Sequence, residues 1–352
     1  MTNFCSDNAS GAAPEIIEAL AKANAGAAMP YGNDDWTRRV EARLQQIFET
    51  DCRVFPVATG TAANVLGLSL LTPPYGAVYC HEEAHVNIDE CGAPEFYTGG
   101  AKLVALPGAH GKLSPEALAA AITGAGNQSR VQPAAVSLSQ ATEAGTVYRP
   151  PEVAAIAEVA RAHGLGLQMD GARFANALVS LGCTPAEVTW KAGVDVLSFG
   201  ATKNGAMAAE AVVLFRPELA ESLPYRRKQG GHLFSKMRFL SAQLEAYLED
   251  DLWLALAARA NASARRLADG LAAIPGACLV HPVEANEIFC RLPEAMIDGL
   301  LADGFQFYRW GAPAASEVRL VCAFERTEVE VDAFLAAARH LAGTADAAAV
   351  SA

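Results

Sequence analysis

Short apolar runs alternate with longer Ala- and Leu-rich segments of helical periodicity through the first two thirds of the chain. The apolar runs expected to form strands are residues 53–58, 77–80, 102–106, 134–138, 165–169 and 195–199, and expected helices lie at 62–71, 114–122 and 151–162. Continuous apolar strands separated by helices are typical of a parallel sheet that is covered on both faces. The sequence therefore predicts an α/β domain with a mostly parallel sheet.

The pattern changes after Lys228. Residues 239–271 are almost entirely helical in periodicity, and short strands expected at 278–280, 287–291 and 317–322 then alternate with helices. This change indicates a second and smaller α+β unit, as a chain of 352 residues allows. We predict a large domain over residues 1–240 and a small C-terminal domain over residues 241–352.

Composition excludes several kinds of partner. The net charge of -12 argues against a nucleic-acid or anionic-membrane surface. No apolar run approaches the ~20 residues that span a bilayer, and the start of the chain lacks the pattern of a signal peptide. The eight cysteines form no CxxC pairs, which favours reduced thiols. We expect a cytoplasmic protein that binds a small molecule.

Three polar signals directly follow predicted strands, at the edge where open α/β sheets bind their ligands. The first is Thr59-Gly60-Thr61, which stands between a strand and a helix. The backbone N–H groups of a helix start suit a phosphate. Such turns are also common where nothing is bound, so this signal alone is weak.

The other two signals are an acid and a lysine. Asp170 ends an apolar strand; it is either the N-cap of the next helix or a carboxylate that keeps a pyridine nitrogen protonated. Lys203 follows another strand, and small neighbours such as Gly200 and Gly205 leave room for a bulky ring. Most lysines are solvated surface groups, but a partly desolvated amine can attack an aldehyde. In this order the three signals resemble those of the fold-type-I enzymes, which hold pyridoxal phosphate (PLP) as a Schiff base, and the resemblance implies that Lys203 forms it here.

The chain resembles the low-specificity L-threonine aldolase family, in its phenylserine-aldolase-like bacterial branch, within the fold-type-I PLP enzymes. The resemblance covers nearly the whole chain, is weakest after Leu271, and rests on the segments SDNASG, AMPYGNDDWT, TGTAAN, HEEAHVNIDECGAPEF, QATEAGTVY, MDGARF, GCTPAEVTWKAG, SFGATKNG and KQGGHLFSKMRFLSAQ. It implies an aspartate-aminotransferase-like fold, in which the large domain binds PLP and a smaller α+β domain follows. It also implies a homo-oligomer, at least a dimer and in many members a tetramer.

The resemblance implies roles for individual residues near the cofactor. Lys203 matches the catalytic Schiff-base lysine, and Asp170 matches the partner of the pyridine nitrogen. His85 matches an imidazole that stacks on the ring, and it is our candidate for the catalytic base because its pKa lies near neutrality. The remaining cofactor contacts are matched by Gly60, Thr61 and Arg173, of which Arg173 also lies near the substrate carboxylate.

Four further residues complete the implied site. Ser6 and Arg319 match the groups that hold the substrate carboxylate, and a buried Arg319 in an apolar strand needs an anion. Tyr31 and Lys228 match residues that reach the cofactor of a neighbouring subunit, where many members carry Arg in place of Lys228. No metal site is expected.

One segment departs from the family pattern. Many members carry a second active-site histidine about ten residues before the QATEAG motif. In this chain the corresponding stretch is NQSRVQP, with Ser129 or Arg130 near the expected place. The substitution predicts a change in the preference between threonine and allo-threonine, or in the tolerance for aryl side chains.

The implied reaction is the PLP-dependent retro-aldol cleavage of L-threonine, L-allo-threonine and related β-hydroxy-α-amino acids, phenylserine included, to glycine and an aldehyde. The first alternative is another fold-type-I PLP lyase or an aminotransferase acting on a small amino acid. The presence of His85 favours aldol cleavage, because aminotransferases more often stack an aromatic residue there. The second alternative is a ligand-binding or scaffolding protein without catalysis.

Overall fold

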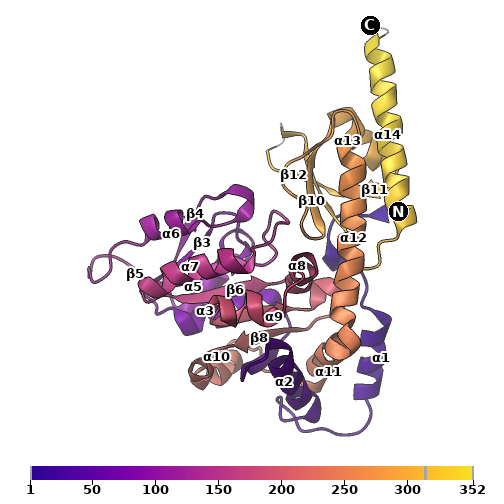
Figure 1. Ribbon diagram of the computed structural model, residues 1–352. Helices are drawn as coiled ribbons and strands as arrows, with labels where there is room; N and C mark the ends of the chain where they lie inside the picture. Colours follow the sequence, from indigo (N-terminus) through magenta and orange to yellow (C-terminus); the bar gives the residue numbers. More distant parts are fainter. Residues whose placement is uncertain (1, 313–314, 351–352) are drawn as a thin grey trace.

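The computed structural model describes residues 2–312 and 315–350 and confirms the α/β class (Figure 1). Its main sheet has seven strands in the order β2-β8-β7-β6-β5-β3-β4. Each strand expected in the large domain is present. The seven strands are β2 (Arg53–Val57), β3 (Gly76–His81), β4 (Lys102–Leu106), β5 (Gln132–Ser139), β6 (Gly166–Gly171), β7 (Val196–Gly200) and β8 (Glu210–Leu214).

Strand β8 was not predicted, and it is the strand that runs against its neighbours. It pairs antiparallel with both β7 and β2, whereas β3, β4, β5, β6 and β7 pair in parallel. Only residues 201–209 separate β7 from β8, which is too short for the crossover that a parallel pair requires. The chain therefore turns back immediately after Lys203.

The helices cover both faces of this sheet. At the start of α6, Ser114 Oγ accepts a hydrogen bond from the backbone N–H of Ala117 at 3.1 Å, and Pro115 occupies the first turn, as predicted. The helices of this part are α1 (Pro14–Ala23), α2 (Asp35–Phe48), α3 (Gly60–Leu71), α4 (His85–Ile88), α5 (Ala93–Thr98), α6 (Pro115–Ala121), α7 (Pro150–Ala162), α8 (Phe174–Leu181), α9 (Pro185–Val188), α10 (Leu223–Gln229) and α11 (Arg238–Leu248).

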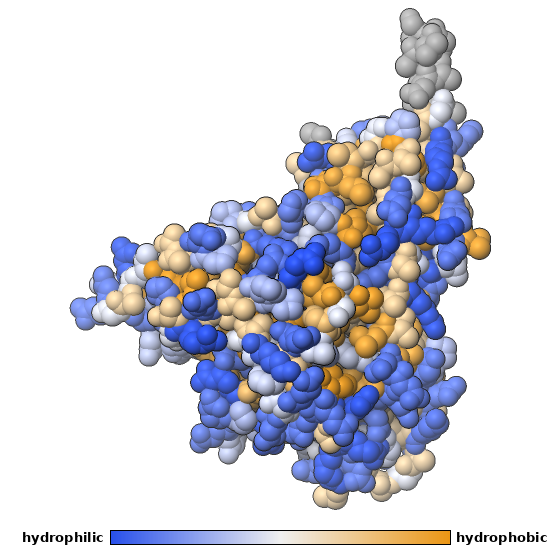
Figure 2. Space-filling model, viewed as in Figure 1, coloured by the Kyte–Doolittle hydropathy of each residue, from blue (hydrophilic) through white to orange (hydrophobic). Residues whose placement is uncertain are grey.

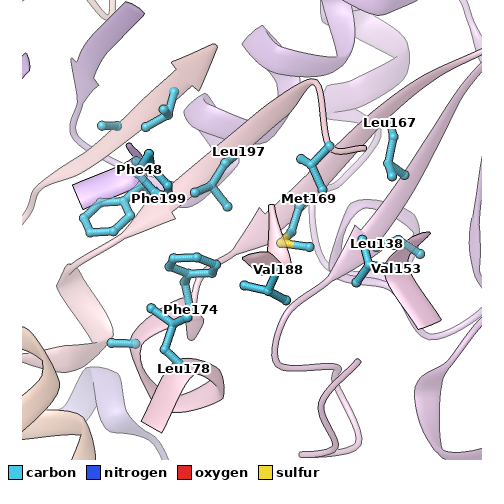
Figure 3. Close-up of a cluster of buried hydrophobic side chains, with 14 of the residues drawn as sticks. Phe48, Leu138, Val153, Leu167, Met169, Phe174, Leu178, Val188, Leu197 and Phe199 are labelled. Carbon is cyan, nitrogen blue, oxygen red and sulfur yellow. The ribbon is translucent and has the colours of Figure 1, made fainter. Parts of the chain in front are cut away.

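Alternate side chains of the central strands β6 and β7 point either into the hydrophobic core or toward the opposite face of the sheet. On one face of the sheet, Met169 of β6 and Phe199 of β7 join a buried cluster with Phe48, Phe174 and residues of α7, α8 and α9 (Figure 3). Successive side chains of a strand point to opposite faces. Asp170, which follows Met169 in β6, therefore points to the other face of the sheet. Helix α3 packs against that face.

The C-terminal part has a hydrophobic cluster of its own, which includes Phe4, Leu267, Leu271 and Leu320. Its sheet has the order β12-β13-β10-β9, and β1 pairs in parallel with β11. The elements are β1 (Thr2–Asn3), α12 (Leu252–Ala272), β9 (Cys278–Leu279), β10 (Glu287–Arg291), α13 (Glu294–Ala302), β11 (Phe305–Gln306), β12 (Tyr308–Trp310), β13 (Glu317–Val321) and α14 (Glu328–Val350).

Two segments link the clusters. Helix α12 buries Trp253 in the first cluster and Leu267 in the second, and it runs between the two parts as one continuous helix (Figure 1). The N-terminal strand β1 pairs with β11, and the adjoining Phe4 is buried in the second cluster. The domain boundary at residue 240 stays a prediction.

The molecular surface in Figure 2 is hydrophilic over most of the face shown, and its apolar residues form separate patches. Among the described helices, none combines the length and the apolar character needed to cross a membrane.

Candidate active site

Two adjoining cavities lie beside the carboxyl ends of β6 and β7. The inner cavity, about 250 Å³, is lined by Gly60, Thr61 and Asp170, and the outer cavity, about 690 Å³, by Ser6, Arg173 and Arg319. Four residues line both: Asn8, His85, Glu143 and Lys203. The structure thus brings together eight of the predicted site residues: Ser6, Gly60, Thr61, His85, Asp170, Arg173, Lys203 and Arg319.

The inner cavity meets the first turn of α3. Thr59 caps this helix, since its Oγ1 accepts a hydrogen bond from the N–H of Ala62 at 3.1 Å. A Cβ placed on Gly60 would have no other atom within 4 Å, so the space beside this turn is open. The free N–H groups and the dipole of a helix start favour an anion. This end of the cavity suits a phosphate.

Asp170 lies at the end of β6 and is 5% exposed. Its Oδ2 accepts a hydrogen bond from Asn64 Nδ2 at 2.8 Å, and its Oδ1 accepts one from the N–H of Ala172 at 3.0 Å. The N-cap position of α8 is Arg173, so the alternative interpretation of Asp170 as a helix cap is wrong. A buried carboxylate in this place suits a protonated ring nitrogen.

Lys203 follows β7 in a short 3-10 helix, Thr202–Asn204, and lies among carboxyl groups. Burial raises the pKa of Glu210 to about 7, although bonds from Thr202 and the charge of Lys203 lower it. Burial also raises the pKa of Glu143, against the charge of Lys203. Two buried carboxyl groups with raised pKa values therefore lie close to the Lys203 amine.

His85 is the first residue of α4 and is partly buried. Its Nδ1 lies 2.9 Å from Glu90 Oε1. This hydrogen bond raises the pKa of His85 above its ordinary value against the effect of burial, and the charges of Asp170 and Glu143 add to the rise. A carboxylate only accepts, so Nδ1 donates and Nε2 is the ring atom that can take a proton.

The two predicted carboxylate-binding arginines share a buried acid. Arg173 Nε donates to Asp7 Oδ2 at 2.8 Å, and its Nη1 lies 3.0 Å from Glu287 Oε2. Arg319 Nη2 donates to the other oxygen, Glu287 Oε1, at 2.6 Å. We expected an anion beside Arg319 because this residue lies in an apolar strand. In the structure Glu287, on the neighbouring strand β10, is that anion. Asp7 and Glu287 therefore hold the two guanidinium groups in place.

The acid stability of the fold should depend on Asp7. Burial would raise the pKa of Asp7, but Arg173 and Lys203 outweigh it and lower the pKa from 3.8 to about 2. A lowered pKa stabilises the fold above the unfolded value, here by about 2 kcal/mol, and the gain is lost as pH falls from about 4 to about 2. We expect the stability difference between the wild type and Asp7→Asn, from urea unfolding, to shrink over that range. A difference that stays constant would contradict this pKa.

Tyr31 and Lys228 lie elsewhere. Within the described residues they contact each other, with Lys228 Nζ 5.0 Å from the centre of the Tyr31 ring, and neither lines the two cavities. Both are exposed. Their role at a neighbouring subunit stays a prediction.

The residues expected in place of a second histidine are also outside the cavities of this chain. Ser129 and Arg130 are exposed and precede β5, at the edge of the sheet opposite Asp170. The wall of the outer cavity instead includes His281, whose Nδ1 lies 3.1 Å from that of His110. Nothing in the sequence pattern around these two histidines predicted their contact.

Several functional candidates were missed by sequence reasoning. Asn64 stands within the TGTAAN segment, one helical turn after Gly60, so its spacing could have placed it at the same end of α3. Glu143 lies inside QATEAG, five residues after the predicted strand 134–138, so it belongs to the loop at the same end of the sheet as Asp170. Asp7 and Glu287 gave no such signal, since only the fold brings them to Arg173.

A lysine after β7, an acid at the end of β6 and a helix start after β2, gathered at one site, define the fold-type-I class of PLP enzymes. Aspartate aminotransferase from Thermus thermophilus shares this fold, with a TM-score of 0.72 at 19% identity over 97% of this chain and 91% of that chain. The beta-eliminating lyase family matches residues 3–295. The chain belongs to this family.

Closer relatives define the type of lyase. The chain is 48% identical to the low specificity L-threonine aldolase of Pseudomonas aeruginosa, over 93% of this chain and 94% of that protein. The structure of a threonine aldolase from Leishmania major aligns with a TM-score of 0.92 at 30% identity, over 97% of this chain and 100% of that chain. The family expected from the sequence is confirmed, and the protein is an enzyme, an aldehyde-lyase of the threonine aldolase type.

Proposed function

We propose that this enzyme uses PLP to cleave L-threonine, L-allo-threonine and related β-hydroxy-α-amino acids, phenylserine among them, to glycine and an aldehyde. The observation that carries the proposal is the position of Lys203 between the two cavities. The inner cavity offers a helix start and Asp170 to a cofactor. The outer cavity offers Ser6, Arg173 and Arg319 to an amino acid.

The residues of the inner cavity fit PLP by their chemistry. Gly60 and Thr61, at the first turn of α3, would hold the phosphate. Asp170, fixed by Asn64 and the N–H of Ala172, would keep the pyridine nitrogen protonated. Lys203 would bond to the aldehyde carbon. When bound, PLP supplies an electron sink for the bond that breaks in the substrate.

The outer cavity would orient the amino acid. Arg319 is fixed by Glu287 and lies with its guanidinium carbon 5.2 Å from the centre of the Trp310 ring. Arg173 is fixed by Asp7 and Glu287, and Ser6 lines the same cavity. Held groups of this kind lose little entropy when they bind a carboxylate. They would set the Cα–Cβ bond perpendicular to the cofactor ring, the geometry in which that bond breaks.

His85 would remove the proton of the β-hydroxyl. Its Nδ1 donates to Glu90, and its Nε2 would accept the proton as the Cα–Cβ bond opens. Since only the neutral imidazole can act as a base, activity should rise as pH rises through the pKa of His85. That pKa is raised by Glu90, so the rise is expected above the pH at which a free histidine titrates.

A homo-oligomer, at least a dimer, completes the proposal. Within the described lining of the inner cavity Lys203 is the one lysine or arginine, and its amine would be bonded to the aldehyde. A phosphate dianion there needs another positive group. Lys228 and Tyr31, both exposed and in contact with each other, would come from a neighbouring subunit, as in a dimer or tetramer.

The products formed from L-threonine distinguish aldol cleavage from its nearest rival. The family description and the aminotransferase-like fold make elimination on the same lysine the second candidate. We expect glycine and acetaldehyde in equal amounts from the PLP-loaded enzyme, and neither from the Lys203→Ala variant. The formation of 2-oxobutanoate without glycine would show elimination and overturn the proposal. A panel with L-allo-threonine and phenylserine then ranks the side chains.

A further inference from the structure

The proposed base belongs to a buried chain of hydrogen bonds that ends at Asp170. His85 Nδ1 lies 2.9 Å from Glu90 Oε1. Asn64 Nδ2 donates to the same Glu90 oxygen at 2.9 Å and to Asp170 Oδ2 at 2.8 Å. Asn64 is 1% exposed, and Glu90 and Asp170 are 5% exposed. One buried amide therefore bridges the acid beside His85 and the acid at the end of β6.

The donors and acceptors of the neighbouring side chains give this chain of hydrogen bonds a direction. Gln168 Nε2 donates to Asn64 Oδ1 at 3.0 Å, and Ser137 Oγ donates to Gln168 Oε1 at 2.5 Å. The carbonyl of Asn64 therefore faces Gln168, and its NH2 group faces the two carboxylates. Glu90 can only accept when ionised, so His85 must donate from Nδ1. The ring proton therefore lies on Nδ1, and Nε2, the proposed base, carries none.

Glu90 is a buried acid with one oxygen that lacks a hydrogen-bond partner in the described structure, and it lies close to a second acid, Asp170. Its second oxygen, Oε2, is buried and has no hydrogen-bond partner among the described residues. A buried and unsatisfied carboxylate oxygen is unfavourable, and such groups in a folded protein call for an explanation. His85, Glu90 and Asp170 also place ligand-type atoms within 4.8 Å of one another. Since Asn64 already donates to both acids, hydrogen bonding accounts for this cluster without an ion.

We propose that Glu90 is a positioning residue, which holds His85 in the tautomer with a free Nε2 and, through Asn64, ties the base to Asp170. Glu90 and Asn64 would then fix the positions of both His85 and Asp170. The role of the positioned imidazole rests on the proposed function. The tautomer itself does not, because the hydrogen bonds are properties of the protein without cofactor or substrate.

Nitrogen NMR of the cofactor-free protein, labelled at its seven histidines, tests the tautomer directly. The signal of His85 is identified by its loss in His85→Gln. In the wild type we expect the neutral ring to carry its proton on Nδ1. A wild-type ring protonated on Nε2 would overturn the proposal without any need for a variant.

The Glu90→Gln variant removes the charge and keeps the size of the side chain. The charged groups that face His85 are Glu90, Asp170 and Glu143, and the last two remain in this variant. We expect the imidazole titration midpoint to fall by about one pH unit and the Nδ1-H preference to weaken. Glu82→Gln, the same change at an exposed position three residues before His85, should leave both unchanged.

Kinetics of the PLP-loaded variant add a second readout. The acid limb of kcat/KM against pH should move to lower pH with the NMR midpoint, and kcat at its plateau should fall roughly 10-fold. If Glu90 were only structural, kcat would fall with no movement of the limb or of the midpoint, and the proposal would fail. If the NMR result holds but threonine is not cleaved, the proposed function fails and the positioning by Glu90 stands.

Discussion

Replacement of Lys203 with alanine is expected to give a folded protein that binds PLP without visible absorbance of the covalently held form and that lacks activity. The amine is the group that bonds to the cofactor aldehyde, and no other lysine lines the inner cavity in the described structure. Activity should fall roughly 10³-fold or more. Absorption spectra and product formation from threonine measure both losses.

The fold should survive this change because the loop is held by the next residue. Asn204 Nδ2 donates to Tyr247 Oη and to the carbonyl of Trp253, both at 2.8 Å. Lys191→Ala serves as the control, since Lys191 is a surface lysine that pairs with Glu49. This variant should keep its colour and its activity. A yellow and active Lys203→Ala protein would refute the assignment of the cofactor lysine.

Replacement of Arg173 with methionine is expected to cost about 3–5 kcal/mol of stability. The guanidinium is 3% exposed and lies between the carboxylates of Asp7 and Glu287, which are 1% and 0% exposed. Removal of the cation leaves the buried Asp7 without its arginine and leaves the buried Glu287 paired with Arg319 alone. The free energy of unfolding in urea, measured on the cofactor-free protein at neutral pH, gives the loss.

A surface pair of similar geometry provides the control. Arg266 makes two hydrogen bonds to Asp332, at 2.8 and 2.7 Å, but both side chains are about half exposed. Arg266→Met should therefore cost at most about 1 kcal/mol. Equal losses in the two variants would show that burial of the Asp7–Arg173–Glu287 cluster contributes little.

Residues that follow predicted strands could be found from the sequence. Apolar runs located the parallel strands, so Gly60, Asp170 and Lys203 could be placed at one edge of the sheet before any coordinates were known. Strand β8 was missed although four of its five residues are apolar, and its antiparallel direction depends on the short loop after Lys203. An apolar run such as residues 210–214 does not show whether the strand lies parallel or antiparallel to its neighbours in the sheet.

The partners of these residues could not be predicted in the same way. Asp7 and Arg173 lie 166 positions apart, and Asn64 and Asp170 lie 106 apart, so no local pattern joins them. The apolar strand around Arg319 did require an anion, but only the pairing of β10 with β13 shows that Glu287 provides it. Long-range contacts of this kind depend on the whole fold.

The segment from β1 to Asn8 connects the C-terminal part of the molecule to the part that contains the seven-stranded sheet. At one end β1 is paired with β11, and a few residues later Asp7 is bonded to Arg173 while Ser6 and Asn8 line the outer cavity. Helix α12 is the second connection, since it contributes residues to both hydrophobic clusters. A rotation of the C-terminal part about α12 would displace this segment, so Ser6 and Asn8 in the wall of the outer cavity would move together with that part.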